Sequence, residues 1–382
     1  MKQRCLIIAD DLTGGADTGA QFAKNSLSTF LITSDQGYPI DFSKYSHHNT
    51  LVINTDSRGL NPEAAFLSVS NLLKGFDPDL FPLIYKKVDS TLRGNIGYEI
   101  DALIAETNPS VCLVAPSYPE QKRTVVDGVL MIGGKPLAST ELSCDPTSPV
   151  QESHVCRLLN HQSRNPVGWI GLKDVASGGG PLQRRADEER RKGNRILVFD
   201  AVSRQDLMNI IILAFQIERR PLLVGSAGLA KELAQKLSFP KPEFLQTFKE
   251  GPGPFKHIFI ISGSASSITH QQLEHLHGKE VPEFILHPSW VTQRDCSSEI
   301  EKRAFVEKIA KALSKKHALL KTPPEFIAKD LTGFPIHLKI TEMLAVLALS
   351  ALEESEVVSH ELALVLTGGE TAMSLIRLLQ AE

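Results

Sequence analysis

Apolar runs of strand length alternate with helix-length segments over most of this 382-residue chain, and this alternation restricts the possible fold more than any other feature. A chain of this kind forms parallel sheets that are covered by helices. We therefore expect an α/β protein in which each sheet is mostly parallel and flanked by helices. The predicted strands are 4–9, 28–33, 51–54, 82–87, 111–115, 167–171, 195–199 and 221–224, and the predicted helices are 14–25, 62–74, 95–106, 181–192, 203–216 and 227–237.

Two segments interrupt the alternation. Residues 116–150 are rich in Pro, Ser, Thr and Gly, and we expect a β-ribbon around Gly128–Gly134 that leaves the regular series. Residues 238–254 contain four prolines and two glycines, which disfavour regular structure. The length and this second break predict a two-lobed protein with the active site in the cleft between the lobes. The predicted parts are an N-terminal domain over 1–240, a linker over 241–255 and a C-terminal domain over 256–382.

The composition disfavours several classes of function. A net charge of −3 argues against nucleic-acid binding, and no apolar stretch is long enough for a membrane span. The five cysteines form no C-x-x-C pair, which fits a reducing compartment and argues against a zinc site. The first apolar run ends at Asp10, too early for a signal peptide. We expect a cytoplasmic protein with no dedicated metal site and no nucleic-acid or membrane partner.

Two predicted strands of the C-terminal domain run into small, hydroxyl-rich turns that are followed by helices. Such turns leave backbone N–H groups unpaired at a helix N-terminus, where the helix dipole also favours negative charge. They therefore predict a nucleotide phosphate site, although neither the Rossmann nor the P-loop spacing is present. The two strand–turn segments are Ile258–Ser267 and Leu362–Ala372.

Polar side chains follow three predicted strands of the N-terminal domain. Asp10 and Asp11 follow the first strand, Arg58 follows the third, and the charged segment 86–95 follows the fourth. Because ligands gather at the carboxyl ends of strands in open α/β sheets, these residues predict a pocket for a small polyhydroxy acid. Arg58 and a lysine could bind a carboxylate, and Asp89 could bind sugar hydroxyls.

Simpler roles remain open for two of these groups. One of the adjacent aspartates may be required only to cap the following helix, which leaves Asp11 either as a cap or as a ligand-binding residue. Arg123, in the predicted ribbon, either closes over the site or lies on the surface, and the surface position is the simpler expectation.

These motifs resemble those of the four-carbon acid sugar kinases, the ATP-dependent kinases of threonate, erythronate and their oxo relatives. The string Lys87–Asn95 is the specific part, and its form resembles the threonate and erythronate branch. The matching segments follow the family's order along nearly the whole chain. They are Ala9–Asp17, Asp56–Arg58, Lys86–Glu99, Pro116–Thr124, Asp145–Pro146, Val224–Ala230, Ser262–Ser264 and Thr367–Ala372.

The resemblance implies a kinase that phosphorylates the terminal 4-hydroxyl of a four-carbon sugar acid such as D-threonate or D-erythronate. ATP would be the donor and would carry its Mg²⁺, and a homodimer is expected as a possibility. Asp11 or Asp89 would be the catalytic residue, and the sequence does not choose between them. The implied acid-binding residues are Asp11, Arg58, Lys87, Val88, Asp89, Ser90, Thr91 and Arg93. The implied nucleotide-binding residues are Ser262, Ser264, Gly368, Gly369, Glu370 and Thr371.

Two alternatives compete with an active kinase. A two-lobed acid-binding protein without turnover would share the fold, but the paired phosphate turns and the missing export signal count against it. The other alternative starts from the end at Glu382, because family members continue with a further strand and turn. This predicts an incomplete C-terminal domain and a truncated kinase that binds ATP but is catalytically impaired.

Overall fold

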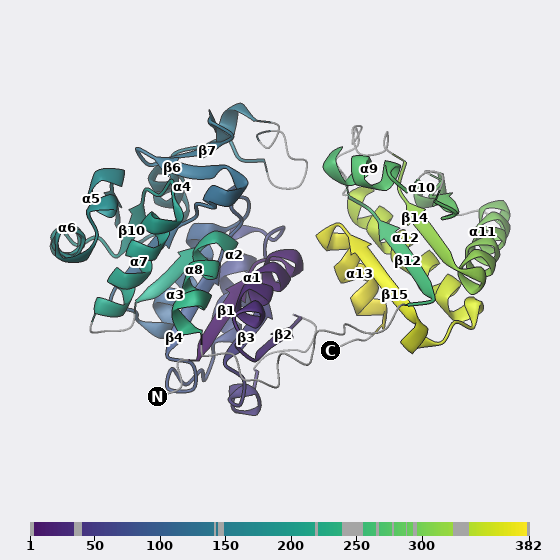
Figure 1. Cartoon of the computed structure of the whole chain (residues 1–382), viewed down its shortest axis with the longest axis horizontal. Coiled ribbons are helices and arrows are strands. Elements are labelled where there is room, and N and C mark those ends of the chain that lie inside the picture. Colours follow the sequence, from purple (N-terminus) through teal and green to yellow (C-terminus); the bar gives the residue numbers. More distant parts are fainter. Residues whose placement is uncertain are drawn as a thin grey trace. The chain divides into compact units, whose positions relative to one another are not determined.

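The chain divides into two units, Met1–Leu245 and Gln246–Glu382, each with its own sheet and core (Figure 1). The predicted linker over 241–255 lies outside the described residues except for Phe255, so the predicted domain bounds stay a prediction. The computed structural model describes residues 4–33, 40–140, 143, 149–217, 221–238, 255–264, 267–276, 279–287, 289–292, 296–323 and 336–379.

The first unit is built on an eight-stranded sheet in the order β2-β3-β1-β4-β11-β5-β10-β9, with every neighbouring pair parallel. Each strand agrees with its predicted range to within one residue at either end. The bounds are β1 (Cys5–Ala9), β2 (Thr29–Ile32), β3 (Thr50–Asn54), β4 (Leu83–Lys87), β5 (Cys112–Ala115), β9 (Val167–Ile170), β10 (Ile196–Phe199) and β11 (Leu222–Gly225).

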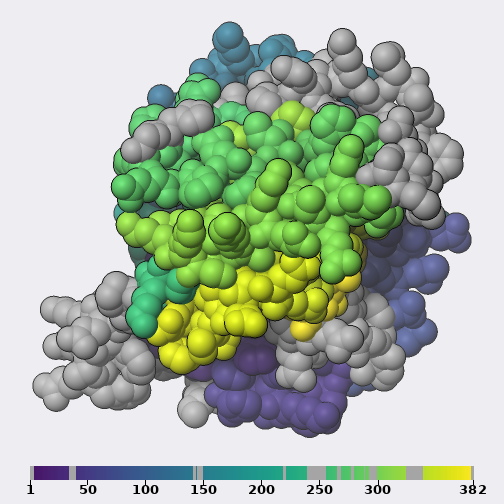
Figure 2. Space-filling model, turned by 90° about the vertical axis from the view of Figure 1, so that its right-hand side faces the viewer, coloured from purple at the N-terminus to yellow at the C-terminus, as the bar shows by residue number. Residues whose placement is uncertain are grey.

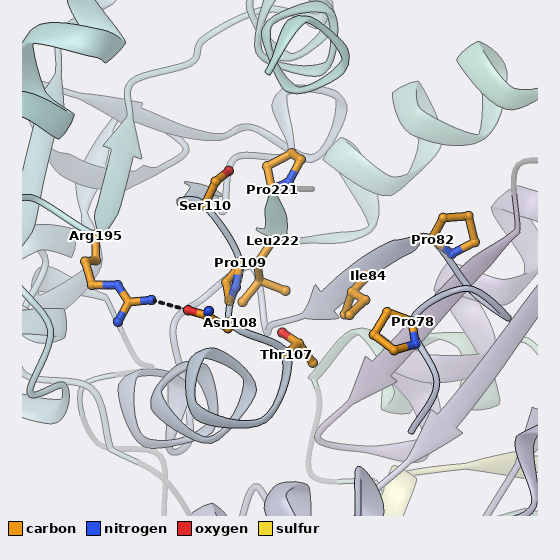
Figure 3. Close-up of a pocket in the computed structure, with 10 residues that line it drawn as sticks. All are labelled: Pro78, Pro82, Ile84, Thr107, Asn108, Pro109, Ser110, Arg195, Pro221 and Leu222. Atoms are coloured by element: carbon orange, nitrogen blue, oxygen red, sulfur yellow. Dashed lines mark hydrogen bonds between the residues drawn. The ribbon is translucent and has the colours of Figure 1, made fainter. Parts of the chain in front are cut away.

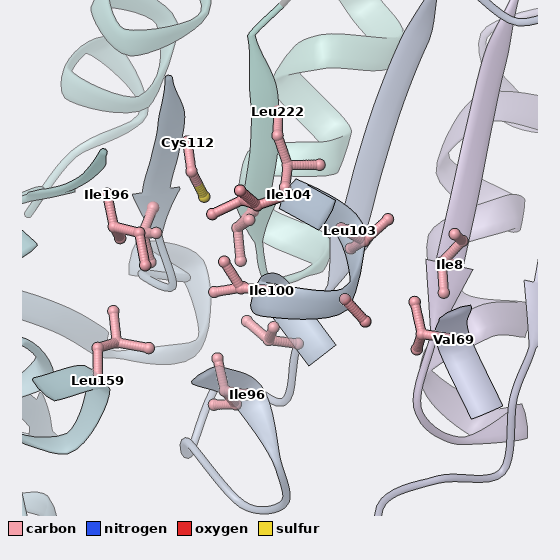
Figure 4. Packing of buried hydrophobic residues seen from close by; sticks show 14 of the residues in the cluster. Ile8, Val69, Ile96, Ile100, Leu103, Ile104, Cys112, Leu159, Ile196 and Leu222 are labelled. Carbon is pink, nitrogen blue, oxygen red and sulfur yellow. The ribbon is translucent and has the colours of Figure 1, made fainter. Parts of the chain in front are cut away.

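Helices cover both faces of this sheet, because alternate strand residues belong to two different buried clusters. One cluster joins Ile8 of β1 to helices α2, α3 and α4, and Figure 4 shows Ile8 with Val69 and Ile100. The other joins Ile7 to α1, α5, α6, α7 and α8. The bounds are α1 (Leu12–Lys24), α2 (Pro62–Leu72), α3 (Ile96–Thr107), α4 (Val155–Gln162), α5 (Leu172–Ser177), α6 (Gly179–Arg191), α7 (Arg204–Gln216) and α8 (Ala227–Leu237).

An antiparallel ribbon of β6 (Arg123–Val126), β7 (Val129–Ile132) and β8 (Lys135–Pro136) follows β5, which confirms the predicted interruption. The ribbon is fixed to the sheet by Asp200, whose carboxylate accepts hydrogen bonds from the backbone N–H groups of Asp127 and Gly128 at 2.8 and 2.9 Å. Asp200 directly follows β10, so the ribbon is anchored at the carboxyl edge of the sheet.

The second unit has a four-stranded parallel sheet in the order β13-β14-β12-β15. Phe259 and Leu320 of this sheet pack with α11 and α12 in one buried cluster. Figure 2 shows one face of this unit, on which its yellow C-terminal residues lie beside its green residues. Both units thus confirm the predicted α/β class. The bounds are β12 (His257–Ser262), β13 (Glu283–Ile285), β14 (His317–Lys321), β15 (Leu362–Thr367), α9 (Ser267–Glu274), α10 (Ser289–Thr292), α11 (Cys296–Lys315), α12 (Ile336–Ser355) and α13 (Gly369–Leu379).

No helix in the described part of the chain is long and apolar enough to cross a membrane.

Candidate active site

The candidate acid site lies where the chain changes direction across the first sheet. Strand β1 lies between β3 and β4. Helix α1, which follows β1, covers one face, whereas α2 and α3, which follow β3 and β4, cover the other. Open α/β sheets bind ligands at such a switch point, outside the carboxyl ends of the strands. The polar strand ends predicted from the sequence therefore share the ligand-binding edge of the sheet.

Arg58 joins the loops after β3 and β1. Its Nε donates to Asp10 Oδ2 at 2.8 Å, and its Nη2 donates to Asp10 Oδ1 at 3.1 Å and to Asp11 Oδ1 at 2.7 Å. Gly94, at φ +95°, allows this close packing, since a Cβ there would lie 3.1 Å from Arg58 Cγ. Two of the three guanidinium nitrogens of Arg58, Nε and Nη2, are thus engaged with aspartates, and its Nη1 has no hydrogen bond to any described residue.

Asp11 caps the helix, which is one of the two roles that the sequence left open, and its ligand-binding role stays a prediction. Its Oδ1 accepts a hydrogen bond from the Gly14 N–H at 3.0 Å and caps α1, which therefore begins two residues before its predicted start. Its Oδ2 has no hydrogen-bond partner among the described residues. Burial raises the pKa of Asp11, and the neighbouring charge of Asp10 adds to this effect, which together outweigh the opposing charge of Arg58.

Lys87, the last residue of β4, is a buried cation. The residue is 5% exposed, and its ammonium group forms no hydrogen bond or ion pair with the described residues. A Cβ on Gly14 would lie 2.7 Å from Lys87 Nζ, so the ammonium reaches the first turn of α1. Burial lowers the pKa of Lys87, although the nearby Asp10 and Asp11 favour its charged form. A buried cation without a partner is the expected state of a group that awaits an anionic ligand.

Asp89 is, by contrast, fully engaged at one oxygen. Its Oδ2 accepts from Arg93 Nε at 2.6 Å and also from the Thr91 hydroxyl. Burial alone would favour the neutral carboxyl, but the guanidinium groups of Arg58 and Arg93 hold the pKa of Asp89 well below its usual range. Asp89 is therefore a stable anion that accepts hydrogen bonds.

Two other predicted residues of this loop differ in their orientation. The Val88 side chain is buried in the core cluster on the α2–α4 face, and its N–H donates to Gly225 O at 2.9 Å, so its side chain does not line the site. The Ser90 hydroxyl accepts a hydrogen bond from Arg123 Nη1 of the ribbon. The expectation of a surface Arg123 is wrong, because the side chain is half-buried and contacts the predicted acid-binding loop.

A buried ion pair lies beneath this site and was not predicted as part of it. Lys86 Nζ pairs with Glu99 Oε2, and the Ser57 hydroxyl donates to Glu99 Oε1 at 2.8 Å. Burial raises the pKa of Glu99, and the charge of Asp10 adds to this while Lys86 opposes it. Asp10 was named at the strand end but was not given an acid-binding role, and the structure pairs it with Arg58.

In the second unit, the two hydroxyl-rich turns lie side by side because β12 and β15 are neighbours. Thr367 Oγ1 donates to Ser262 Oγ at 2.8 Å across this pair. Gly368 has φ +96°, and a Cβ there would lie 3.4 Å from the Ser264 backbone nitrogen. The residue types therefore leave room for a ligand to approach the backbone closely.

Thr371 lies in the first turn of α13 and is fully buried, yet its hydroxyl has no hydrogen-bond partner among the described residues. The same hydroxyl lies close to the positions that a Cβ on Gly263 or Gly368 would occupy. An orphaned hydroxyl beside a helix N-terminus and two glycines fits a phosphate oxygen. Glu370, in the same turn, is exposed.

Comparison with known proteins identifies the family. Residues 5–233 match the family of sugar-binding N-terminal domains. The chain is 30% identical over 391 residues to the D-threonate kinase of Salmonella typhimurium, which covers 99% of this chain and 87% of that protein. The chain belongs to the four-carbon acid sugar kinase family. A second relative of this family, the D-erythronate kinase of Heliobacterium modesticaldum, is 33% identical over 273 residues, or 70% of this chain and 59% of that protein.

A solved structure of a Haemophilus influenzae protein has the same fold, with a TM-score of 0.70 over 98% of this chain and 88% of that chain at 24% identity. The resemblance to four-carbon acid sugar kinases that the sequence motifs indicated is thus confirmed.

This member of the four-carbon acid sugar kinase family also has a pocket at the opposite edge of its first sheet. It has a volume of about 600 Å³ and lies at the amino ends of β4, β5 and β11 (Figure 3). Pro82, Pro109 and Pro221 line it, and Arg195 Nη2 donates to Asn108 Oδ1 across it at 3.4 Å. None of the predicted site residues lines this pocket, so it is separate from the candidate active site.

Proposed function

We propose that this protein is an ATP-dependent kinase that phosphorylates the terminal hydroxyl of a four-carbon sugar acid such as D-threonate or D-erythronate. The observation that supports this most directly is the placement of the buried Lys87 beside Asp11. Among the described residues, the Lys87 ammonium has no hydrogen-bond or ion-pair partner and one oxygen of Asp11 is unengaged. One group suits a negatively charged ligand and the other suits a hydroxyl proton. Both named relatives are kinases of acids of this size.

Asp11 is the better candidate for the base that accepts the proton of the attacking hydroxyl. Its free Oδ2 and its raised pKa suit proton transfer, whereas Arg58 and Arg93 stabilise the charged form of Asp89. Asp89 would instead accept hydrogen bonds from the acid's other hydroxyls. Lys87, next to Asp11, would stabilise the negative charge that gathers at the reacting hydroxyl and the transferred phosphoryl group.

Arg58 would hold Asp10 and Asp11 in place and contact the acid through its remaining Nη1. Val88 would face the substrate with its backbone only. The other predicted residues of the acid site would surround the substrate with hydroxyl and charged groups. They are Lys87, Asp89, Ser90, Thr91 and Arg93.

The paired turns of the second unit would bind ATP through Ser262, Ser264 and the segment Gly368–Thr371. The glycine backbone, the α13 N-terminus and the unpaired Thr371 hydroxyl support this assignment. Mg²⁺ would arrive with the nucleotide and neutralise charge on its phosphates. That transfer takes place in a cleft between the two units stays a prediction.

An ADP-release assay across the tetronic acids tests this proposal. We expect ADP release that depends on one or more of these acids, and little release with ATP alone. If no tetronic acid stimulates ADP release, the proposed activity is wrong and the protein would instead be an acid-binding protein without turnover. The comparisons do not support that alternative, because the named relatives are kinases. We also propose that the protein acts in the cytoplasm, where ATP is available, and self-association as a homodimer is a prediction for size measurements.

A further inference from the structure

Two cations of the candidate acid site have no carboxylate partner among the described residues, namely Lys87 and Arg123. The other three are paired: Arg58 with Asp10 and Asp11, Lys86 with Glu99, and Arg93 with Asp89. Arg123 makes a single side-chain hydrogen bond, from Nη1 to the Ser90 hydroxyl, and its Nε and Nη2 have no described partner. Burial lowers the pKa of Arg123 while Asp89 favours its charge, and a guanidinium remains charged in proteins.

The ribbon holds Arg123 in a fixed position. The Arg123 N–H donates to Tyr118 O at 3.1 Å, and the Tyr118 N–H donates to Arg123 O at 2.7 Å. Two residues further on, the Val125 N–H donates to Ala201 O at 3.1 Å, next to the Asp200 anchor of the ribbon. Hydrogen bonds thus hold the backbone at Arg123 and two residues beyond it. The guanidinium therefore has little conformational freedom to lose when it binds a ligand.

Resting on the proposed function, we propose that Arg123, next to Ser90, binds the carboxylate of the sugar acid and makes the protein selective for acids over neutral analogues. The reacting hydroxyl must lie near Asp11, and Lys87 reaches the start of α1 beside that residue. The carboxylate is at the other end of the four-carbon chain and needs a second cation. Arg58 is occupied by two aspartates, whereas Arg123 has Nε and Nη2 available for bidentate binding.

The test compares Arg123→Gln with the unaltered protein in calorimetric titrations of D-threonate, D-erythronate and the primary amide of each acid. The amide keeps the hydroxyls but lacks the negative charge. We expect Arg123→Gln to weaken binding of the acid about 10- to 100-fold, as for hydrogen bonds to charged groups, and to leave amide binding nearly unchanged. Arg123→Lys, which keeps the charge but not the planar fork, should give an intermediate acid affinity.

The matched control is Arg157→Gln, which removes an exposed arginine of α4 and should leave both affinities unchanged. Equal losses of acid and amide affinity in Arg123→Gln, or an unaltered protein that binds acid and amide equally, would overturn the proposal. An unchanged unfolding midpoint shows that Arg123→Gln still folds. Failure of the proposed kinase activity is distinct, because it would leave acid-selective binding in place without ADP release.

Discussion

The two units use different chemistry at their candidate sites. In the first unit, five cations and four carboxylates meet at one sheet edge, and three of the cations pair with the four carboxylates. In the second unit, the paired turns contain one charged residue, Glu370, which is exposed, and otherwise offer backbone and hydroxyl groups. The acid site can therefore discriminate by charge and position, whereas the turns suit a phosphate, which is common to all nucleotides.

This difference determines how each site can be damaged. Removing one partner of a buried ion pair leaves an uncompensated charge, so the acid site should be sensitive to changes of charge. The paired turns depend on the absence of side chains at Gly263 and Gly368, so they should be sensitive to added volume instead. Substitutions of these two kinds provide direct tests of the comparison.

The largest effect is expected for Asp11→Asn. The amide keeps the size of the side chain but cannot accept the hydroxyl proton, so kcat should fall about 10²- to 10⁴-fold. ATP affinity should change little, because the proposed nucleotide residues belong to the second unit. The measurement is ADP release with the best tetronic acid, with Asp17→Asn, an exposed aspartate of the same helix, as control. A kcat within threefold of the unaltered protein would exclude Asp11 as the base.

Glu99→Gln should produce the next largest effect, on stability. The buried Lys86 would lose its carboxylate, and breaking such a pair costs about 3–5 kcal/mol. The two tryptophans separate the units, since Trp169 lies in the first and Trp290 in the second. In a Trp290→Phe background, Trp169 fluorescence during urea unfolding should show that Glu99→Gln strongly lowers the free energy of unfolding of the first unit.

The exposed Glu63→Gln serves as the matched control for this substitution and should be nearly neutral. The double variant Lys86→Met with Glu99→Leu should recover much of the lost stability, because it removes both charges together. If Glu99→Gln were as mild as Glu63→Gln, the buried pair would not be an important part of the acid site's support.

The strands of the first unit and six of its helices were predictable, because strands such as β1 and β10 are buried throughout and appear as continuous apolar runs. The short helices α4 and α5 were not predicted. The set of residues at the acid site was also predictable, since the ends of parallel strands meet at one edge. Their pairing was not. Arg58 and Asp11 are 47 residues apart, and no local pattern indicates that one guanidinium engages two aspartates.

The contact of Arg123 with Ser90 shows the same limit. The ribbon was expected from its composition, but its anchor is Asp200, 73 residues beyond Asp127, and only the folded chain brings Arg123 to the acid site. The orphaned hydroxyl of Thr371 could not be predicted either, because the sequence shows that a hydroxyl is present but not whether it finds a partner.

Gly368→Val should lower ATP affinity at the paired turns of the second unit, because the added side chain occupies space there. A branched side chain at φ +96° is strained and would crowd the Ser264 backbone nitrogen, so ATP affinity should fall about 10- to 100-fold. Affinity for the sugar acid, measured by titration without nucleotide, should stay the same. Gly75→Val, at φ +75° in the first unit with open space around its Cβ position, controls for backbone strain alone. Unchanged ATP affinity in Gly368→Val would place the nucleotide elsewhere.

Arg58→Gln should change the pH dependence of the first site. Catalysis requires Asp11 to be deprotonated, so kcat/KM should fall as pH drops through its raised pKa, above the usual value of about 3.9. Loss of the Arg58 cation raises this pKa further, so the acid limb should move to higher pH. Arg157→Gln should leave the limb in place. A limb that stays fixed or moves down in Arg58→Gln would show that Asp11 is not the titrating base.

The smallest effect is expected for Thr371→Val, which should raise stability while it lowers ATP affinity. The free protein buries this hydroxyl without a described partner, so replacing it with a methyl group should stabilise the second unit by about 1 kcal/mol. Trp290 fluorescence in a Trp169→Phe background would report this gain. The same change should weaken ATP binding about 5- to 10-fold, because the phosphate would lose a hydrogen bond.

Thr367→Val is the matched comparison for Thr371→Val, because the Thr367 hydroxyl already donates to Ser262. Its removal should destabilise the second unit by about 1 kcal/mol, the opposite sign. The paired charges of the acid site do not allow such a gain, since each of them is needed by its partner. If Thr371→Val lowered stability and left ATP affinity unchanged, the hydroxyl would be satisfied within the protein and the paired turns would not bind phosphate through it.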